Sequence, residues 1–283
     1  MAGLTGRLEI EDRLALLVLD PGQPGPISTT WWWTRNDRTA ETAYLLVSAT
    51  TPVMTREILD LVLVLLVVAS ATTCIAAHYR NRQRLFWISK PLTLGFVLLL
   101  ASQPSLSTSS IYQGLLVTGL VFSLAGDVFL MLPSDRFVAG LASFFVGHVF
   151  YVAAFAADAG PASAFVREPL LLLAMLAASA GLYAYLWSGL GDMKLPVAIY
   201  GVGIAAMAWQ ATARWNETEQ FGALLACSGA LLFVVSDSVL AVNRFRRSFG
   251  AAQAVVLGTY FSAQCLIALS IGSGDSIVDW AMR

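Results

Sequence analysis

The chain has 283 residues, of which 57% are hydrophobic and only 12% are charged, and its mean hydropathy is +0.70. Soluble domains carry about 25% charged residues. This composition excludes an ordinary soluble domain and is typical of a protein that crosses a membrane several times. The formal net charge of −1 gives no indication of nucleic-acid binding.

The first 55 residues differ from the rest of the chain. They contain a run rich in proline and glycine from Pro21 to Pro26 and three consecutive tryptophans, Trp31–Trp33, but no apolar run of spanning length. Acidic residues stand where a signal peptide has its basic region. We interpret residues 1–55 as an N-terminal extension that is flexible or anchored at the membrane interface by its tryptophans. A true translation start at Met54 is a further alternative.

Eight apolar runs follow, separated by short polar segments. Most of them reach the roughly 20 residues that a helix needs to cross a bilayer. Strands would leave backbone groups unsatisfied in lipid, and no alternating barrel pattern is present. We therefore predict an all-α, polytopic membrane bundle of eight transmembrane helices over residues 56–273, followed by a short C-terminal tail, 274–283. The predicted spans are 57–78, 86–102, 111–132, 138–157, 168–188, 195–212, 220–242 and 249–272.

Lysine and arginine are distributed unevenly over the connecting loops. The loops after the odd-numbered spans hold nine of them, and the loops after the second, fourth and sixth spans hold two. The positive-inside rule then places the odd-numbered loops in the cytoplasm, although an error in the span count would reverse the C-terminal half. The protein is expected in a bacterial cytoplasmic membrane or in the endoplasmic reticulum.

Two aspartates lie inside predicted spans, Asp127 in the third and Asp237 in the seventh. A carboxylate in hydrocarbon costs about 2.5–3.5 kcal/mol on insertion scales, so such residues usually have a task. Each lies five residues before the predicted cytoplasmic end of its span, about 8 Å deep at 1.5 Å per residue. This equal depth predicts one shared polar chamber. The alternative is that both carboxylates are structural and bond to neighbouring helices.

A histidine and two tyrosines accompany the acids. Tyr200 lies five residues into the sixth span, at a comparable depth. His148 lies near the middle of the fourth span and shares a helix face with Tyr151. A single histidine in a helix is usually a packing residue, but the facing acids favour a functional one.

Three further polar positions have simpler alternatives. Lys90 lies near the cytoplasmic start of the second span, where it either binds substrate or extends to lipid headgroups. Gln264 follows Tyr260 by one turn, and an interhelical hydrogen bond is its simplest explanation. The arginine cluster at 244–247 marks a cytoplasmic loop or holds a lipid phosphate.

Motifs for metals and cofactors are missing from the sequence. Two aspartates and a histidine resemble carboxylate–histidine metal sites in helical bundles, but no Glu-x-x-His pair is present. Cys74, Cys227 and Cys265 are isolated in apolar runs and are expected to pack as small hydrophobic residues. Neither a nucleophile elbow nor a phosphate-binding glycine motif occurs. We expect no metal and no cofactor.

From the second span to the eighth, the chain carries a series of short motifs. They are Lys90-Pro91, Gly126-Asp127 with Leu130, Phe137, Gly140, Phe144, His148, Tyr151, Pro196, Tyr200, Met207, Gly229, Phe233, Ser236-Asp237, Leu240 and the run Tyr260–Gln264. Together these motifs resemble the YhhN-like family, the transmembrane lysoplasmalogenases. The resemblance covers about residues 57–272. It departs from the family pattern at residues 248–251, where a proline-containing lead-in is common, and this leaves the start of the eighth span open.

The resemblance implies an enzyme that hydrolyses the vinyl ether bond of lysoplasmalogens. The products are a fatty aldehyde and glycerophosphocholine or glycerophosphoethanolamine. Protonating the β-carbon of a vinyl ether requires a protonated acid, and the resulting cation is stabilised by a nearby carboxylate. Two close carboxyls in a dry pocket divide in this way, with the assignment of acid and base open. The hypothesis assigns catalysis to Asp127, Asp237 and His148, and substrate binding to Lys90, Tyr151, Tyr200, Tyr260 and Gln264, with Lys90 holding the substrate phosphate at the membrane surface.

Other functions compete with hydrolysis. Acids within a membrane also relay protons, so a proton-coupled transporter or a lipid flippase is the main alternative. Against it, the spans lack the paired glycine and proline interruptions of broken helices. A membrane scaffold with architectural acids is a third possibility. The expected partner is a lysolipid within the bilayer, and the oligomeric state stays undetermined.

Overall fold

A computed structural model describes residues 38–105, 108–132, 134, 136–159 and 168–273, with side chains from residue 57 onward. The chain forms two compact units, residues 1–55 and residues 56–283. The predictions for residues 1–37, including the anchoring by Trp31–Trp33, lie outside the described residues, as does the tail 274–283. Residues 38–55 are helical, because α2 begins at Arg38, whereas the sequence predicts a flexible segment up to residue 55. The segment holds three alanines and two leucines, which favour helix, although threonine is its commonest residue.

Every described element is a helix. The eight long ones are α2 (Arg38–Tyr79), α3 (Gln83–Ala101), α4 (Ser110–Met131), α5 (Phe137–Ala159), α7 (Pro169–Leu186), α8 (Lys194–Thr218), α9 (Phe221–Phe245) and α10 (Ala252–Leu269). Two short 3₁₀ turns, Trp187–Gly189 and Gly191–Met193, connect α7 to α8. Within the described residues, eight helices are long and apolar enough to cross a membrane. The prediction of eight spanning helices is confirmed.

Two helix ends differ from the predicted ones for a physical reason. α8 continues to Thr218, six residues beyond the predicted end, because Arg214 is hydrogen-bonded inside the bundle. α9 continues to Phe245 and so includes Asn243 and Arg244, which the hydropathy pattern assigned to a loop. A hydropathy pattern ends where polar residues begin, whereas a helix can continue inside the bundle through polar residues whose side chains have partners.

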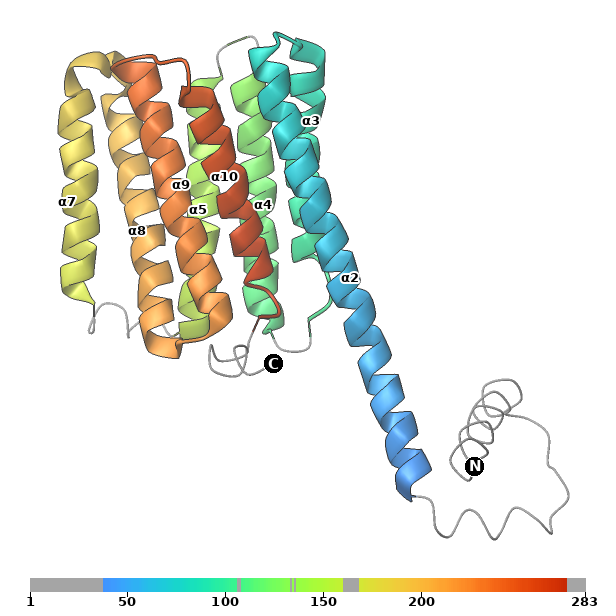
Figure 1. The fold of residues 1–283 in the computed structure, drawn as a ribbon. Helices are drawn as coiled ribbons and strands as arrows, with labels where there is room; N and C mark the ends of the chain where they lie inside the picture. Colours follow the sequence, from blue (N-terminus) through green and yellow to red (C-terminus); the bar gives the residue numbers. More distant parts are fainter. Residues whose placement is uncertain (1–37, 106–107, 133, 135, 160–167, 274–283) are drawn as a thin grey trace, which may run out of the picture. The chain divides into compact units, whose positions relative to one another are not determined.

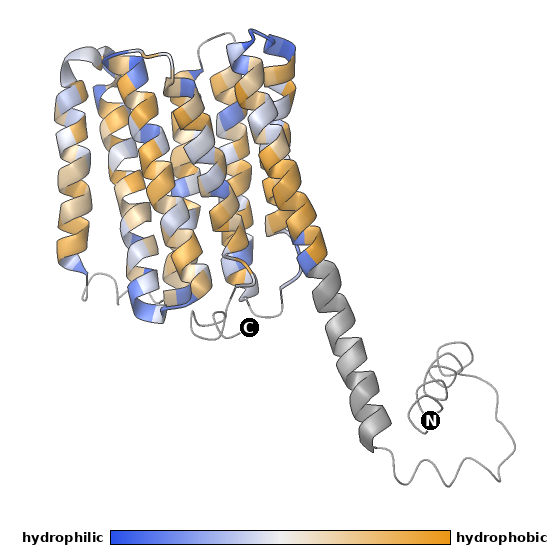
Figure 2. Ribbon diagram, viewed as in Figure 1, coloured by the Kyte–Doolittle hydropathy of each residue, from blue (hydrophilic) through white to orange (hydrophobic). Residues whose placement is uncertain are grey.

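Six of the helices contact one another in a closed circuit, in the order α3, α4, α5, α8, α9, α10 and back to α3. α7 packs outside this ring, against α8 and α9 (Figure 1). Residues of the last part of α2 bond to the ring, through Ser70 to the Ser89 carbonyl and through Tyr79 to the Gly250 carbonyl. Apolar residues dominate the shafts of the helices, and polar residues gather at their two ends (Figure 2).

The ring is closed by tight packing of small residues, as is common between membrane helices. A Cβ at Gly229 of α9 would lie 2.7 Å from the Ala263 carbonyl oxygen and 2.8 Å from Ile267 Cγ1 of α10. Only glycine allows this approach of the two backbones. The pairing brings the Ser236-Asp237 turn, two turns further along α9, against Val256 of α10.

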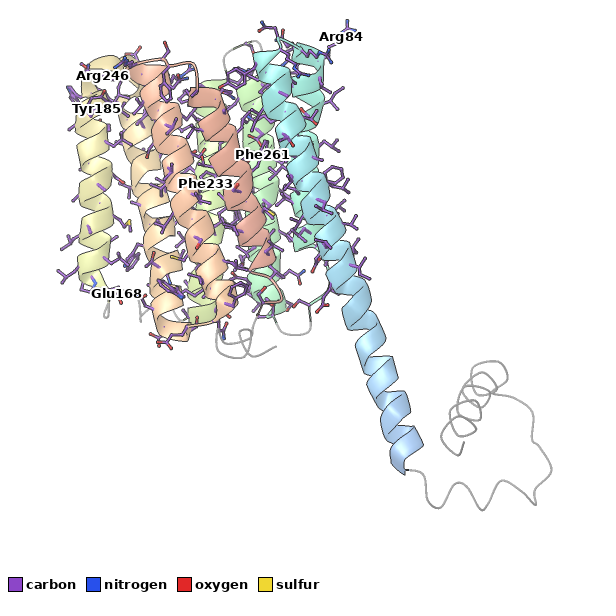
Figure 3. All side chains as sticks on the ribbon, in the orientation of Figure 1. Arg84, Glu168, Tyr185, Phe233, Arg246 and Phe261 are labelled. Atoms are coloured by element: carbon purple, nitrogen blue, oxygen red, sulfur yellow. The ribbon has the colours of Figure 1, made fainter. Side chains whose placement is uncertain are left out.

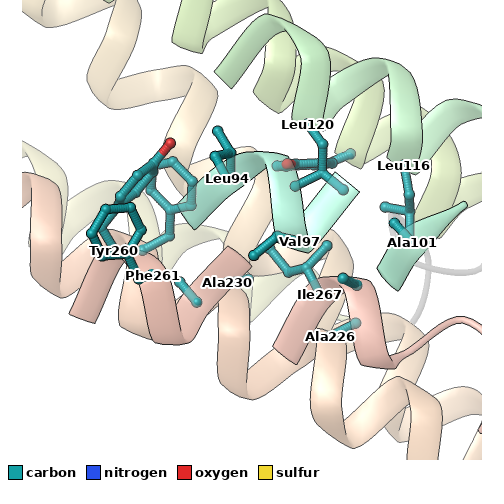
Figure 4. Packing of buried hydrophobic residues seen from close by; sticks show 14 of the residues in the cluster. Leu94, Val97, Ala101, Leu116, Leu120, Ala226, Ala230, Tyr260, Phe261 and Ile267 are labelled. Atoms are coloured by element: carbon teal, nitrogen blue, oxygen red, sulfur yellow. The ribbon is translucent and has the colours of Figure 1, made fainter. Parts of the chain in front are cut away.

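An apolar core fills the ring on one side of the polar chamber. Leu94 of α3, Leu116 and Leu120 of α4, Ala230 of α9 and Ile267 of α10 are all completely buried (Figure 4). Each fully buried aliphatic side chain of this kind contributes on the order of 1.5–3 kcal/mol when it leaves water, but in a membrane the gain comes mainly from packing contacts.

A buried arginine joins three helices at the end opposite the arginine cluster 244–247. Arg214 of α8 donates from Nε to Asp158 of α5 over 2.8 Å and from Nη1 to the Tyr112 hydroxyl of α4 over 3.0 Å. Its guanidinium also lies 4.5 Å from the centre of the Tyr112 ring. The Tyr112 hydroxyl is in turn bonded to Ser270 Oγ. This cluster holds α4, α5, α8 and the end of α10 together.

We expect Arg214→Met to lower the free energy of unfolding by about 1.5–3 kcal/mol, because hydrogen bonds to a charged group are lost and Tyr112 loses a buried partner. Denaturant unfolding in detergent micelles, followed by circular dichroism, measures the change. The exposed Arg84→Met serves as the control and should stay within about 0.5 kcal/mol of the parent. Equal stability of the two variants would contradict a structural role for Arg214.

Candidate active site

The six helices of the ring each place one chemically active side chain toward a common region. None of these side chains is more than partly exposed. The residues are Lys90 of α3, Asp127 of α4, His148 of α5, Tyr200 of α8, Asp237 of α9 and Tyr260 of α10. Residues separated by up to 170 positions thus form one polar cluster within an apolar bundle.

Asp127 is the most highly connected member of the cluster. The Lys90 ammonium lies 2.9 Å from its Oδ1, and the Tyr260 hydroxyl donates to its Oδ2 over 2.9 Å. Asp127 is 1% exposed and Lys90 is 7% exposed, so this is a buried ion pair. In such a pair the attraction between the two groups offsets part of the cost of removing each from water.

Asp237 has a different environment. The Tyr200 hydroxyl donates a hydrogen bond to its Oδ2, so the neighbour is a phenol and not a cation. The adjacent Ser236 donates to the Val256 carbonyl over 3.1 Å and thereby holds this turn of α9 against α10. Asp127 and Asp237 line the same pocket. Two carboxyl groups with unequal partners therefore border one cavity.

Both acids line a single pocket of about 410 Å³ at one end of the bundle. The pocket extends from His78 and Arg244, which are exposed, to the buried Asp127. Its volume is in the range of sites for small-molecule ligands. The shared polar chamber that the equal depth of the acids predicts is thus present. Lys90, Tyr200 and Tyr260 also line it.

His148, Tyr151 and Gln264 lie behind this pocket and are not among the described residues that line it. The His148 ring is fully buried, with its centre 5.2 Å from that of Tyr200 and 4.8 Å from that of Phe233. Neither of its ring nitrogens has a hydrogen-bond partner within the described part of the chain. Phe233 lies midway along the bundle (Figure 3). The His148 ring therefore packs on Tyr200 and Phe233, outside the pocket that the two carboxyl groups line.

Gln264 makes the interhelical bond that its position in the eighth span suggested. Its Oε1 accepts from the Tyr151 hydroxyl over 2.7 Å, which connects α10 to α5. Both side chains are completely buried. The sequence also assigns Tyr151 and Gln264 to substrate binding. Their hydrogen bond occupies the Tyr151 hydroxyl, and neither residue is among the described residues that line the pocket.

The mouth of the pocket contains polar residues that the sequence did not assign to the site. They are His78 at the end of α2, Asn243 and Arg244 at the end of α9, and Gln253 at the start of α10. The Arg244 guanidinium lies 4.0 Å from the centre of the Phe137 ring. In the sequence, the arginine cluster at 244–247 is the feature that could have indicated these residues. Because the seventh span is predicted to end at residue 242, the cluster is assigned to a loop and not to the site.

Comparisons with known proteins agree with this architecture. A family model described as the YhhN family matches residues 85–271. The uncharacterized membrane protein YhhN of Escherichia coli O6:H1 is 33% identical over 202 residues, which cover 71% of this chain and 94% of that protein. Human lysoplasmalogenase TMEM86B is 39% identical over 165 residues, covering 58% of this chain and 66% of that protein.

Human lysoplasmalogenase TMEM86A is likewise 39% identical over 166 residues, which cover 54% of this chain and 62% of that protein. No solved structure matches the chain. The matched segment of the family model begins in α3 and ends just after α10, so it contains every helix of the ring and every residue of the polar cluster.

Proposed function

Because the chain belongs to the YhhN family, we propose that this integral membrane protein is a lysoplasmalogenase that cleaves the vinyl ether bond of alkenyl lysolipids. The names of its human relatives support this reaction. The observation that carries the proposal is the single pocket in which one carboxyl group is paired with lysine and another with tyrosine. That pairing suits a reaction that needs one charged and one proton-carrying acid.

The overall reaction adds one water to the vinyl ether and yields an aldehyde and an alcohol. A carboxylic acid donates its proton to the β-carbon, whose π electrons form the new C–H bond, and an oxocarbenium ion results. Water attacks the α-carbon and gives up a proton, which restores the acid. The hemiacetal then releases the glycerol oxygen, which takes up the hydroxyl proton, and the chain leaves as the aldehyde. No cofactor is needed for these steps.

We assign the proton donor to Asp237 and the stabilising carboxylate to Asp127. The Lys90 ammonium favours the ionised form of Asp127, as an opposite charge at ion-pair distance does. Asp237 has a phenol as its neighbour, whose hydroxyl donates to Oδ2, and we place the acidic proton on Oδ1. A buried carboxyl with a neutral partner is the one that holds a proton more readily. The ionised Asp127 then faces the oxocarbenium ion.

The polar mouth suits the phosphate of the headgroup. Arg244 contributes a guanidinium, which binds phosphate oxygens in a bidentate manner, and His78, Asn243 and Gln253 add donors around it. Lys90 was expected to hold the phosphate, but its ammonium is already paired with Asp127 deep in the pocket. We therefore transfer phosphate binding to Arg244. His148 becomes a positioning residue that supports the ring of Tyr200.

The same end of the bundle carries most of the basic residues. Arg84 and Arg246 lie there, and Glu168 lies at the opposite end (Figure 3). By the positive-inside rule this end faces the cytoplasm. The headgroup of the substrate then enters, and glycerophosphocholine or glycerophosphoethanolamine leaves, on the cytoplasmic side.

The proposal is tested with purified protein in micelles and three lysolipids that differ only in the bond to the chain. The alkenyl compound should release aldehyde, whereas the acyl and alkyl compounds should not react, because only the vinyl ether is cleaved after protonation of carbon. Aldehyde is measured by a coupled dehydrogenase. Release of fatty acid from the acyl compound would point to another lysolipid hydrolase. Binding of all three without any product would favour the transporter or flippase.

A further inference from the structure

A second cavity, of about 530 Å³, lies between α7, α8 and α9. Its walls are formed mostly by apolar and small side chains of these helices. Among them are Met175, Ser179 and Leu182 of α7 and Ala198, Gly201 and Ala205 of α8. A Cβ placed on Gly201 would have no atom within 4 Å, so this part of the cavity is open space. Small residues usually let membrane helices pack closely, but here they leave room.

The second cavity meets the active-site pocket at four shared residues. Tyr200 and Asp237 line both, together with Val197 and Ala241. The hydrogen bond between Tyr200 and Asp237 therefore lies where a pocket lined by lysine and arginine meets a cavity with no basic residue among its described lining. A lysolipid has the same division, with a charged headgroup on one side of its ether bond and one long hydrocarbon chain on the other.

From this geometry we infer that the cavity between α7, α8 and α9 holds the alkenyl chain of the substrate. The inference rests on the proposed function for the identity of that chain. The β-carbon of the vinyl ether is the second carbon of the chain, so the acid that protonates it must lie where the chain leaves the headgroup pocket. Asp237 occupies that position, whereas Asp127 lines the headgroup pocket and is not among the described residues of the second cavity.

The position of α7 gives the chain a route from the bilayer. α7 packs outside the ring and has only Leu186 buried among its residues, so one lipid-facing helix separates the cavity from the membrane. A chain that enters past α7 stays in an apolar environment throughout. The length of the cavity beyond Asp237 then selects the chain length, because added methylenes gain contacts only while the cavity has room.

Replacing small residues on the open wall of the cavity by leucine tests whether the cavity holds the alkenyl chain. We expect Gly201→Leu to reduce the ratio of kcat/KM for an octadecenyl lysolipid over that for an octenyl one by about tenfold, in line with the effect of lost methylene contacts. Ala198→Leu, on the same wall one turn earlier, should act in the same direction. Gly181→Leu is the matched control, because Gly181 lies on α7, is exposed, and is not among the residues lining either pocket. An unchanged ratio in both cavity variants would overturn the inference.

A binding experiment separates this inference from the reaction itself. A non-hydrolysable alkyl lysolipid with a diazirine near the end of its chain is photocrosslinked to the full-length protein, and the labelled peptides are identified by mass spectrometry. Labelling of α7 and α8 that is lost in Gly201→Leu supports the chain site, even if no aldehyde is ever detected. Equal labelling of the parent protein and of Gly201→Leu, or labelling confined to other helices, overturns the inference. Displacement of the label by diacyl phospholipid as readily as by lysolipid would assign the cavity to an ordinary membrane lipid instead.

Discussion

An Asp237→Asn variant loses aldehyde release by about 10³-fold in kcat, because the amide N–H of asparagine is too weakly acidic to protonate the vinyl ether and general acid catalysis contributes about 10²–10⁴-fold. The side chain keeps its size, and its amide oxygen still accepts from Tyr200. KM should therefore change little, since the lost interaction belongs to the transition state. The measurement is steady-state aldehyde release by purified protein in micelles, with the alkenyl lysolipid as substrate.

The control is the same chemical change at an exposed position. Asp192 lies in the turn between α7 and α8, away from both pockets, and Asp192→Asn should retain the parental kcat. Tyr200→Phe adds a graded comparison, because it removes the hydroxyl that bonds Asp237 and keeps the ring that packs on His148. Near-normal turnover of a folded Asp237→Asn protein would mean that another group supplies the proton.

Breaking the buried ion pair has the largest expected effect on stability. Lys90→Met leaves the carboxylate of Asp127 buried without its cation, and removing one partner of such a pair costs about 3–5 kcal/mol. Asp127→Asn leaves the ammonium uncompensated in the same way. The double variant contains neither charge, so it should recover most of the lost stability. Denaturant unfolding of the four proteins in one detergent gives the coupling energy of the pair.

Among these four proteins, catalytic activity should not recover when stability does. The double variant remains inactive, because Asp127 no longer stabilises the oxocarbenium ion, although the protein is again stable. A double variant that is both stable and active would remove Asp127 from the reaction and leave the pair with a structural role alone. Destabilisations that simply add would show that Lys90 and Asp127 do not stabilise one another.

The sequence predicts the helices well because their signal is local. The eight apolar runs match the observed spans to within a few residues at most ends, since each run must cover the hydrocarbon on its own. The common depth of Asp127 and Asp237 follows from counting residues along two helices, and the pocket contains both. The ends of α8 and α9 were placed too early, because Arg214 and Arg244 are kept in helix by contacts with other helices.

The choice of partners within the site depends on neighbouring helices. Lys90 was interpreted as a phosphate ligand, but the rotation of α3 and its position beside α4 direct its ammonium to Asp127. The sequence groups His148 with the acids because the neighbouring spans carry them, but its side of α5 contacts Tyr200 and Phe233. Depth along a helix can be counted from the sequence, whereas direction around the helix is useful only once the neighbours are known.

The amino-acid sequence by itself determined that this protein is an eight-helix membrane bundle with two acids at one depth, because the cost of exposing polar groups to lipid acts on each segment separately. Only the tertiary structure decided which acid is paired with a cation, which lies beside a phenol, and that an apolar cavity adjoins the second. These features arise from the closed ring of six helices, whose lateral order and rotation are set by side-chain packing between distant segments.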